Sequence, residues 1–148
     1  MDMKSTIGLT IPADASYLDL VRLTLYGIAT KAGFSYEEIE DMKVAVGEAC
    51  NNAILHGYGN DAIGVVDIRF EREAEGLTIR IKDEGSSFQY DQASHREASL
   101  HDKKLSDATV GGLGLFMMQA LMDDVQVHTD RGTEVVLTKM LSRKEEMA

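Results

Sequence analysis

A carboxylate and a carboxamide stand four residues apart within an otherwise apolar stretch of the chain. Residues 48–58 read Glu-Ala-Cys-Asn-Asn-Ala-Ile-Leu-His-Gly-Tyr, inside the apolar pattern of a helix. Glu48 and Asn52 would therefore project from neighbouring turns on the same side of that helix. A buried polar group without a partner costs roughly 1–3 kcal/mol, so a helix that only fills a core has little use for them. Two hard oxygen donors presented together suit Mg²⁺ and a phosphate bound to it.

Two glycine-containing segments elsewhere could complete such a site. Asp83-Glu84-Gly85 follows an apolar run, and an aspartate there can accept a hydrogen bond while Gly85 keeps the backbone close to a flat ligand. By itself, Asp-x-Gly more often marks an ordinary turn. Gly111-Gly112-Leu113-Gly114 opens a predicted helix, where backbone amides bind phosphate oxygens, although a flexible hinge gives the same pattern. Neither a Rossmann fingerprint nor a P-loop has this spacing.

Periodicity predicts two helices before the first of these segments. One begins after a cap at Asp14 or Ser16 and ends at Gly33, which favours a left-handed C-cap. The next begins at Ser35, with Glu38 three residues later as its capping-box partner. The polar pair described above falls on the flank of the apolar stripe of this second helix. That stripe consists of Ile39, Met42, Val46, Ala49, Cys50 and Ala53.

Alternating hydrophobicity predicts several strands around a long irregular segment. The strands are expected at residues 4–11, 63–71 and 77–82, with two closing strands around residues 125–127 and 135–137. A hairpin turn is predicted at Glu75-Gly76, and another at Asp130-Arg131-Gly132. From Asp83 to Thr109 no period is sustained, which is typical of a functional loop or lid.

Composition narrows the class of protein. The chain has 148 residues, which suits a single domain, and its net charge of −10 argues against nucleic-acid binding through phosphate neutralisation. The single cysteine excludes an internal disulfide and fits a reducing compartment. No apolar run approaches the length of a membrane span, and the first residues lack the order of a signal peptide. We expect a cytoplasmic protein with no membrane contact.

The three motifs together, in this order, resemble those of the GHKL ATPase/kinase superfamily. Residues 46–53 with 56–58 resemble its N box, residues 83–88 its G1 box and residues 111–123 its G2 box. Within the superfamily, the chain is most similar to the bacterial anti-sigma-factor serine kinases of the RsbW/SpoIIAB group. This resemblance implies an α+β fold of the Bergerat type: a two-layer sandwich with a mixed, largely antiparallel sheet and helices on one face. It also implies one domain over residues 1–148, with an ATP lid at about residues 84–110.

The resemblance further implies the roles of individual residues in binding Mg-ATP. Asn52 would coordinate Mg²⁺ between the ATP phosphates, and Glu48 would be the general base that takes the proton of an attacking hydroxyl. Asp83 would hydrogen-bond the adenine amino group. The other expected ATP-binding residues are Gly85, Gly112, Leu113, Gly114, Thr133 and His56.

The resemblance also implies partners. The chain would sequester an alternative sigma factor, with sigma-B the expected one, and would phosphorylate a serine or threonine of the anti-anti-sigma factor that antagonises it. Arg22 would contact both partners, and the kinase would be a homodimer. Two alternatives remain: a sigma-binding module with a merely structural nucleotide site, and a stand-alone ATPase or histidine-kinase fragment. No phosphoacceptor helix pair precedes the domain in this sequence, which weighs against the histidine kinase.

Overall fold

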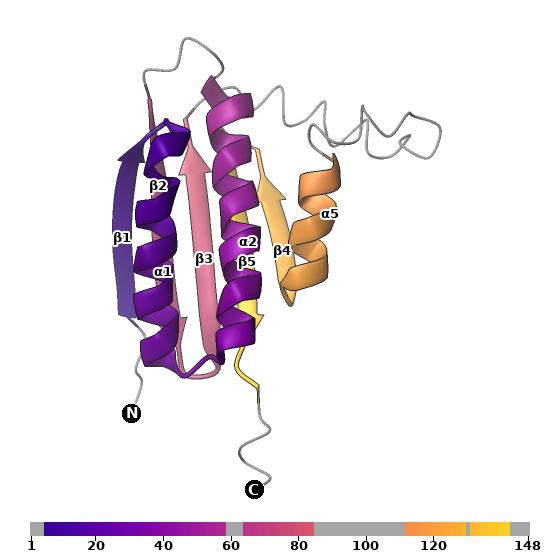
Figure 1. Cartoon of the computed structure of the whole chain (residues 1–148). Helices are drawn as coiled ribbons and strands as arrows, with labels where there is room; N and C mark the ends of the chain where they lie inside the picture. Colours follow the sequence, from indigo (N-terminus) through magenta and orange to yellow (C-terminus); the bar gives the residue numbers. More distant parts are fainter. Residues whose placement is uncertain (1–4, 59–63, 85–111, 130, 143–148) are drawn as a thin grey trace, which may run out of the picture.

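The computed structural model describes residues 5–58, 64–84, 112–129 and 131–142. They form a sandwich of two layers, a five-stranded sheet and the helices that cover one of its faces (Figure 1). The strands are β1 (Ser5–Pro12), β2 (Val65–Glu73), β3 (Gly76–Asp83), β4 (Asp124–His128) and β5 (Thr133–Met140). The helical elements are η1 (Ala15–Tyr17), α1 (Leu18–Ala32), α2 (Tyr36–Asn52), η2 (Ala53–Tyr58) and α5 (Gly112–Leu121). The expected α+β sandwich is confirmed.

The sheet has the strand order β1-β2-β3-β5-β4. Two hairpins, β2–β3 and β4–β5, meet where β3 pairs with β5, and β1 adds to the outer edge of β2. The resemblance implies a mixed, largely antiparallel sheet, whereas every pairing among the described strands is antiparallel.

The helix ends follow the capping signals of the sequence. At the start of α2, the Glu38 backbone N–H donates to Ser35 Oγ (3.1 Å) and the Ser35 N–H donates to Glu38 Oε1 (2.8 Å), which completes the predicted capping box. Gly33 ends α1 in the left-handed region at φ 102°, as predicted. Asp14 caps the short turn η1 and not α1 itself. Its carboxylate accepts from the Ser16 N–H (2.9 Å), and this hydrogen bond lowers the pKa of Asp14.

The β2–β3 hairpin is confirmed, but its turn lies one residue earlier than predicted. Glu73 and Gly76 are paired, which leaves Ala74 and Glu75 as the turn. Gly76 is the first residue of β3. A side chain would not fit there, because a Cβ would lie 2.5 Å from the backbone oxygen of Lys139 on neighbouring β5. The glycine serves a close strand approach and not the turn.

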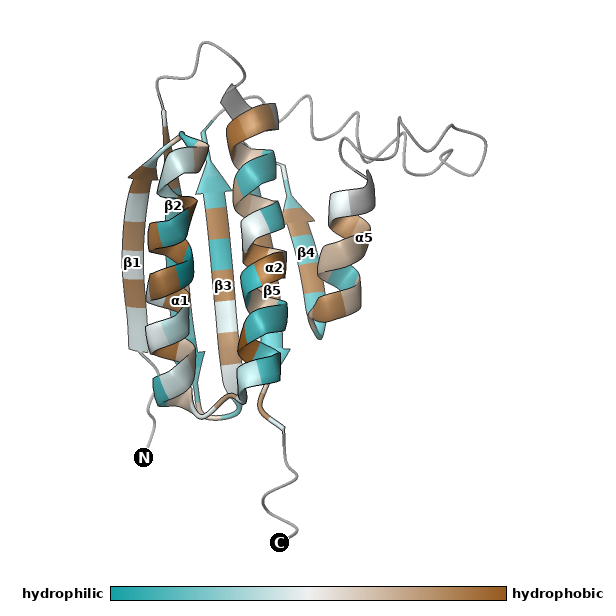
Figure 2. Cartoon of the chain, viewed as in Figure 1, coloured by the Kyte–Doolittle hydropathy of each residue, from teal (hydrophilic) through white to brown (hydrophobic). Residues whose placement is uncertain are grey.

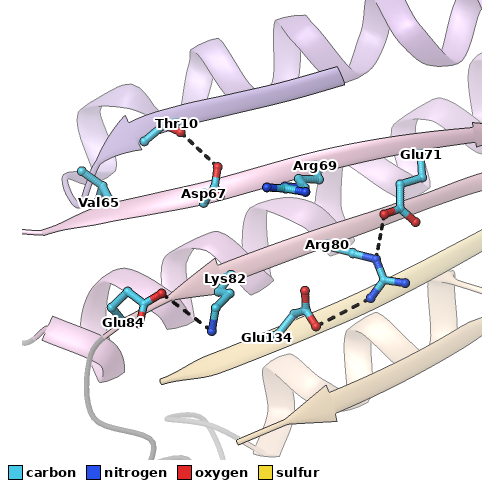
Figure 3. A pocket seen from close by; sticks show the side chains of 9 residues that line it. All are labelled: Thr10, Val65, Asp67, Arg69, Glu71, Arg80, Lys82, Glu84 and Glu134. Atoms are coloured by element: carbon cyan, nitrogen blue, oxygen red, sulfur yellow. Dashed lines mark hydrogen bonds and ion pairs between the residues drawn. The ribbon is translucent and has the colours of Figure 1, made fainter. Parts of the chain in front are cut away.

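The core lies between the helices and the covered face of the sheet. Apolar and polar residues alternate along β3, as the bands in Figure 2 show, and the apolar ones are buried. The other face carries charged side chains. There, Arg80 of β3 reaches Glu71 on β2 (Nε–Oε2 2.9 Å) and Glu134 on β5 (Nη1–Oε1 3.6 Å), as Figure 3 shows.

Within the described part of the chain, none of the helices combines the length and the apolar character that a membrane crossing requires. Of the predicted turn Asp130-Arg131-Gly132, Arg131 and Gly132 have positive φ (61° and 91°) and lie between the antiparallel strands β4 and β5, as a hairpin requires. Residue 130 and the chain end after residue 142 lie outside the described residues.

Candidate active site

Residues from two separate motifs meet where α2 packs against α5. A Cβ placed on Gly114 would lie 3.1 Å from Glu48 Oε1 and 3.2 Å from Asn52 Nδ2. The first turn of α5 therefore lies directly against the polar pair of α2, and a side chain at position 114 would crowd it. The free N–H groups at the start of a helix and the positive end of its dipole favour bound anions, so this junction suits a phosphate.

The two polar residues of α2 differ in burial. Asn52 is 5% exposed, so its carboxamide is held within the packed interior. Glu48 is only half-buried, and it also lines a hollow that opens between α1 and α2. The amide is thus held in place by packing, whereas the carboxylate can be reached from outside. The roles predicted for the two residues, metal ligand and general base, stay predictions.

Asp83 and Thr133 form a second part of the site on neighbouring strands. They are direct partners in the β3–β5 ladder, and each is 2% exposed. Gly132, directly before Thr133, has φ 91°, and a Cβ on it would collide with the backbone oxygen of Asp83. Glycine is therefore needed for both its backbone conformation and its lack of a side chain. Two residues predicted for the adenine side are brought together here although 50 positions separate them.

A change of helical winding links the two parts of the site. After Asn52 the helix widens into the π-helical turn η2, a feature that is frequent at functional sites. η2 packs against β3, the strand that ends at Asp83. The backbone of His56 lies in this turn, while its side chain lies outside what the structure describes.

Part of the predicted site lies outside the described residues. Gly85 and the expected lid beyond Glu84 belong to the segment 85–111. Glu84 itself is exposed, with its carboxylate 3.8 Å from the Lys82 ammonium. Gly112 and Leu113 are the first two residues of α5, which agrees with a helix opening at the glycine run, although their side-chain surroundings are not described.

A hollow of about 480 Å³ lies between α1 and α2, on the side of Glu48 away from α5. Arg22 of α1 and Gly47 of α2 both line it. A Cβ on Gly47 would lie 2.9 Å from Arg22 Nη2, so the guanidinium rests on the helix surface at the glycine. Sequence reasoning named Arg22 but gave no role to Gly47, and the available signal was a glycine inside a strongly predicted helix.

Cys50 lies inside the core, as predicted. Its side chain is fully buried, and burial raises the pKa of the thiol to about 12, although the nearby positive charge of Arg22 acts in the opposite direction. The thiol is therefore protonated near neutral pH, and a protonated buried thiol is a poor nucleophile. Cys50, between the two polar side chains of α2, therefore serves packing.

The donor set fits Mg²⁺ carried by a phosphate ligand. Carboxylate and amide oxygens are the hard donors that Mg²⁺ prefers, and Asn52 presents one of them beside the start of α5. Among the described residues no group of three or more His, Cys, Asp and Glu side chains could hold an ion by itself. Mg²⁺ bound there would take its other ligands from phosphate and water oxygens, as is usual for Mg²⁺ at nucleotides.

A second hollow, of about 550 Å³, lies on the uncovered face of the sheet among the charged side chains of Figure 3. Of the residues predicted for nucleotide or partner binding whose surroundings the structure describes, none lines it. The described residues predicted for the site therefore lie away from this hollow.

Comparison with known proteins shows which class of protein the chain belongs to. Residues 11–139 match the family of histidine kinase-like ATPase domains. A crystal structure of the RsbU and RsbW domains of Rv1364c from Mycobacterium tuberculosis superposes with a TM-score of 0.67 at 22% identity, covering 94% of this chain and 33% of that one. This likeness supports the fold.

Relatives narrow the class further. The serine-protein kinase RsbW of Bacillus subtilis is 42% identical over 137 residues, which cover 92% of this chain and 86% of the relative. RsbW of Listeria monocytogenes is 39% identical over 145 residues, covering 97% and 92%. RsbW of Staphylococcus aureus strain JH9 is 38% identical over 141 residues, covering 94% and 89%. The chain belongs to the RsbW family of serine-protein kinases.

Proposed function

We propose that this protein is an anti-sigma factor that sequesters an alternative sigma factor and phosphorylates its anti-anti-sigma antagonist. The phosphoryl donor is Mg-ATP, and the acceptor is a serine or threonine hydroxyl of the antagonist. The observation that carries the proposal is the meeting of Glu48, Asn52 and Gly114 between α2 and α5. Membership of the RsbW family supports both the reaction and the kind of partner.

The residues of the chain supply position and charge more than covalent chemistry, which is what phosphoryl transfer needs. Asp83 and Thr133 form the adenine side, and the start of α5 receives the phosphates. Asn52 would hold Mg²⁺, and the ion when bound would neutralise charge that develops on the phosphate oxygens. The half-buried position of Glu48 lets an acceptor hydroxyl approach it from the hollow between α1 and α2.

The transfer itself follows from this placement. Glu48 accepts the proton of the acceptor hydroxyl through a carboxylate oxygen. The acceptor oxygen forms a bond to the γ-phosphorus while the bond from that phosphorus to the β,γ-bridging oxygen breaks. The products are ADP, the phosphorylated antagonist and a protonated Glu48, which then returns its proton to solvent.

The first test is incubation of the protein with γ-labelled ATP, Mg²⁺ and the purified antagonist. Label should appear on the antagonist, and Glu48→Gln should keep Mg-ATP affinity while transfer falls by at least about 100-fold. Glu37→Gln, an exposed change at the start of the same helix, is the matched control. If ATP binds but label never moves to the antagonist, the sigma-binding module with a structural nucleotide site becomes the better account.

A second test separates the two residues of α2. Asn52→Ala should weaken Mg-ATP binding itself, by about tenfold or more if one metal ligand is lost. Asn51→Ala is the control for nucleotide affinity, because Asn51 lines the hollow on the α1 side. Equal Mg-ATP affinities for the two variants in titration calorimetry would remove Asn52 from the metal site.

For the sigma factor, we propose a sigma-B type and contact through Arg22. The Arg22 guanidinium is exposed at the hollow beside Glu48, where one cation can serve either partner. Pull-down with purified sigma-B, with and without the antagonist, tests this choice. Retention of another alternative sigma factor in place of sigma-B would correct the specificity while leaving the kinase assignment intact.

We further propose a homodimer acting in the cytoplasm. Two described surfaces could form its contact. One is the outer side of α1, where Leu20, Leu23 and Tyr26 are 44%, 66% and 48% exposed. The other is the uncovered sheet face, where charges of both signs include the exposed Arg69. Light scattering on Leu23→Glu and Arg69→Glu shows which surface is used, and a monomeric wild-type protein would refute the dimer.

A further inference from the structure

The guanidinium of Arg22 rests on a position of α2 that carries no side chain. Three of its atoms approach the point where a Cβ of Gly47 would be: Nη2 at 2.9 Å, and Cζ and Nε at 3.6 Å each. The planar group therefore lies close against the helix backbone. Position 47 directly precedes Glu48, and Arg22, Gly47 and Glu48 all line the same hollow.

Arg22 is a cation without a counter-ion in the described structure. It takes part in no hydrogen bond or ion pair with another described residue, and it is exposed. Lys43, which lines the same hollow, has its ammonium 3.1 Å from Glu40 Oε2 and is locally neutralised. An exposed guanidinium without a partner among the described residues is suited to bidentate binding of a carboxylate.

The glycine at this position works against local helix stability. Glycine in a helix interior is less favourable than alanine, because it loses more backbone freedom on folding. The nearest atoms to a Cβ at position 47 all belong to the end of the flexible Arg22 side chain. The fold would therefore tolerate alanine here, and the structural feature that requires the glycine is the position of Arg22.

We propose that Gly47 is a positioning residue that lets the Arg22 guanidinium lie against α2 in the hollow that Glu48 also lines, where Arg22 binds a carboxylate of the antagonist during phosphorylation. The inference rests on the proposed kinase function and deepens it. Arg22 makes the contact, and Gly47 acts only through Arg22. A side chain at position 47 would move the guanidinium away from the helix without disturbing the nucleotide side of α2.

The test compares Gly47→Ala with Gly27→Ala. Gly27 is also inside a helix, but no atom lies within 4 Å of its Cβ position. Both variants should raise Tm by about 2–4 °C through helix propensity. Only Gly47→Ala should raise the KM for the purified antagonist, by about tenfold, as expected when a charge-assisted hydrogen bond is lost. The KM for ATP should not change in either variant.

A double-mutant cycle completes the test. Arg22→Ala should raise the antagonist KM at least as much as Gly47→Ala does, and adding Gly47→Ala to it should have no further effect. If Arg22→Ala raises KM but Gly47→Ala behaves like Gly27→Ala, the positioning role is overturned and the kinase function stands. If Arg22→Ala changes nothing, the inference also fails. If the wild type transfers no label, it is the proposed function that fails.

Discussion

The most direct perturbation of the site is Gly114→Ala, which adds one methyl group where α5 meets α2. The new Cβ would lie 3.1 Å from Glu48 Oε1 and 3.2 Å from Asn52 Nδ2, so its neighbours must give way by a few tenths of an ångström. Glu48 is half-buried and can move, whereas Asn52 is buried and cannot move easily. The methyl therefore displaces the proposed base, or α5 itself, more readily than the proposed metal ligand.

The expected effect on stability is small. Replacing a helical glycine by alanine gains about 1 kcal/mol of helix propensity, and crowding a packed site costs about 1–3 kcal/mol. The two terms partly cancel, so the free energy of unfolding should change by less than about 2 kcal/mol. The variant should remain folded at 25 °C, which can be confirmed by urea denaturation.

The expected effect on catalysis is large. A misplacement of about 1 Å can lower the rate of a positioned reaction by 100-fold. We therefore expect transfer of label from γ-labelled ATP to the antagonist to fall by about 10- to 100-fold in Gly114→Ala. Gly27→Ala makes the same chemical change at a helical site with open space and should keep the wild-type rate. A folded Gly114→Ala variant with a rate within twofold of wild type would refute the argument that this contact matters.

Three further predictions concern other parts of the structure. Gly132→Ala should lower the free energy of unfolding by about 2–4 kcal/mol through its positive φ and its collision with Asp83. Gly33→Ala has a similar φ, but its Cβ would make only an ordinary contact of 3.9 Å with Leu141, so it should lower the free energy by about 1–2 kcal/mol in the same urea assay. Equal losses would contradict the collision. Asp83→Asn should weaken ATP binding in calorimetry by about tenfold or more, because one acceptor oxygen becomes a donor, and an affinity within twofold would remove Asp83 from the adenine contact. Cys50 should not react with a thiol reagent at pH 8 until the protein unfolds. Its pKa rises from 9.0 to about 12 on folding, so the neutral thiol is favoured in the fold and stability should fall as pH increases above 9; Cys50→Ala should lack this part of the pH dependence.

Local features of the fold were open to prediction from the sequence. The capping box of Ser35 and Glu38, the C-cap at Gly33 and the apolar stripe of α2 depend on residues three or four positions apart, and all three are confirmed. The β2–β3 turn lies one residue earlier than predicted. Gly76, which suggested the turn, instead lets β3 pass close to the backbone of Lys139 on β5. A close contact between β3 and β5 leaves no pattern in the neighbouring residues of the sequence. A turn is therefore easily misplaced wherever a glycine is needed for contact with a strand that is distant in the sequence.

The chemistry of the site was likewise predictable only in part. Glu48 and Asn52 are related by helical periodicity, so the sequence alone places them on one side of α2. Their partner Gly114 and the pairing of Asp83 with Thr133 depended on resemblance to a family, because many residues intervene. Gly47 was missed altogether, since its role depends on how α1 crosses α2.

The amino-acid sequence by itself determined the elements and their chemical content: a polar pair on one side of α2, an aspartate at the end of a strand and glycines at the start of α5. These depend on backbone periodicity and capping, which act over a few residues. The tertiary structure decided which of these groups meet, with Gly114 against Glu48, Gly132 against Asp83 and Arg22 against Gly47. The physical reason is that such contacts are fixed by strand register and helix packing across the whole core, and close packing leaves room for a methyl group at some positions and none at others.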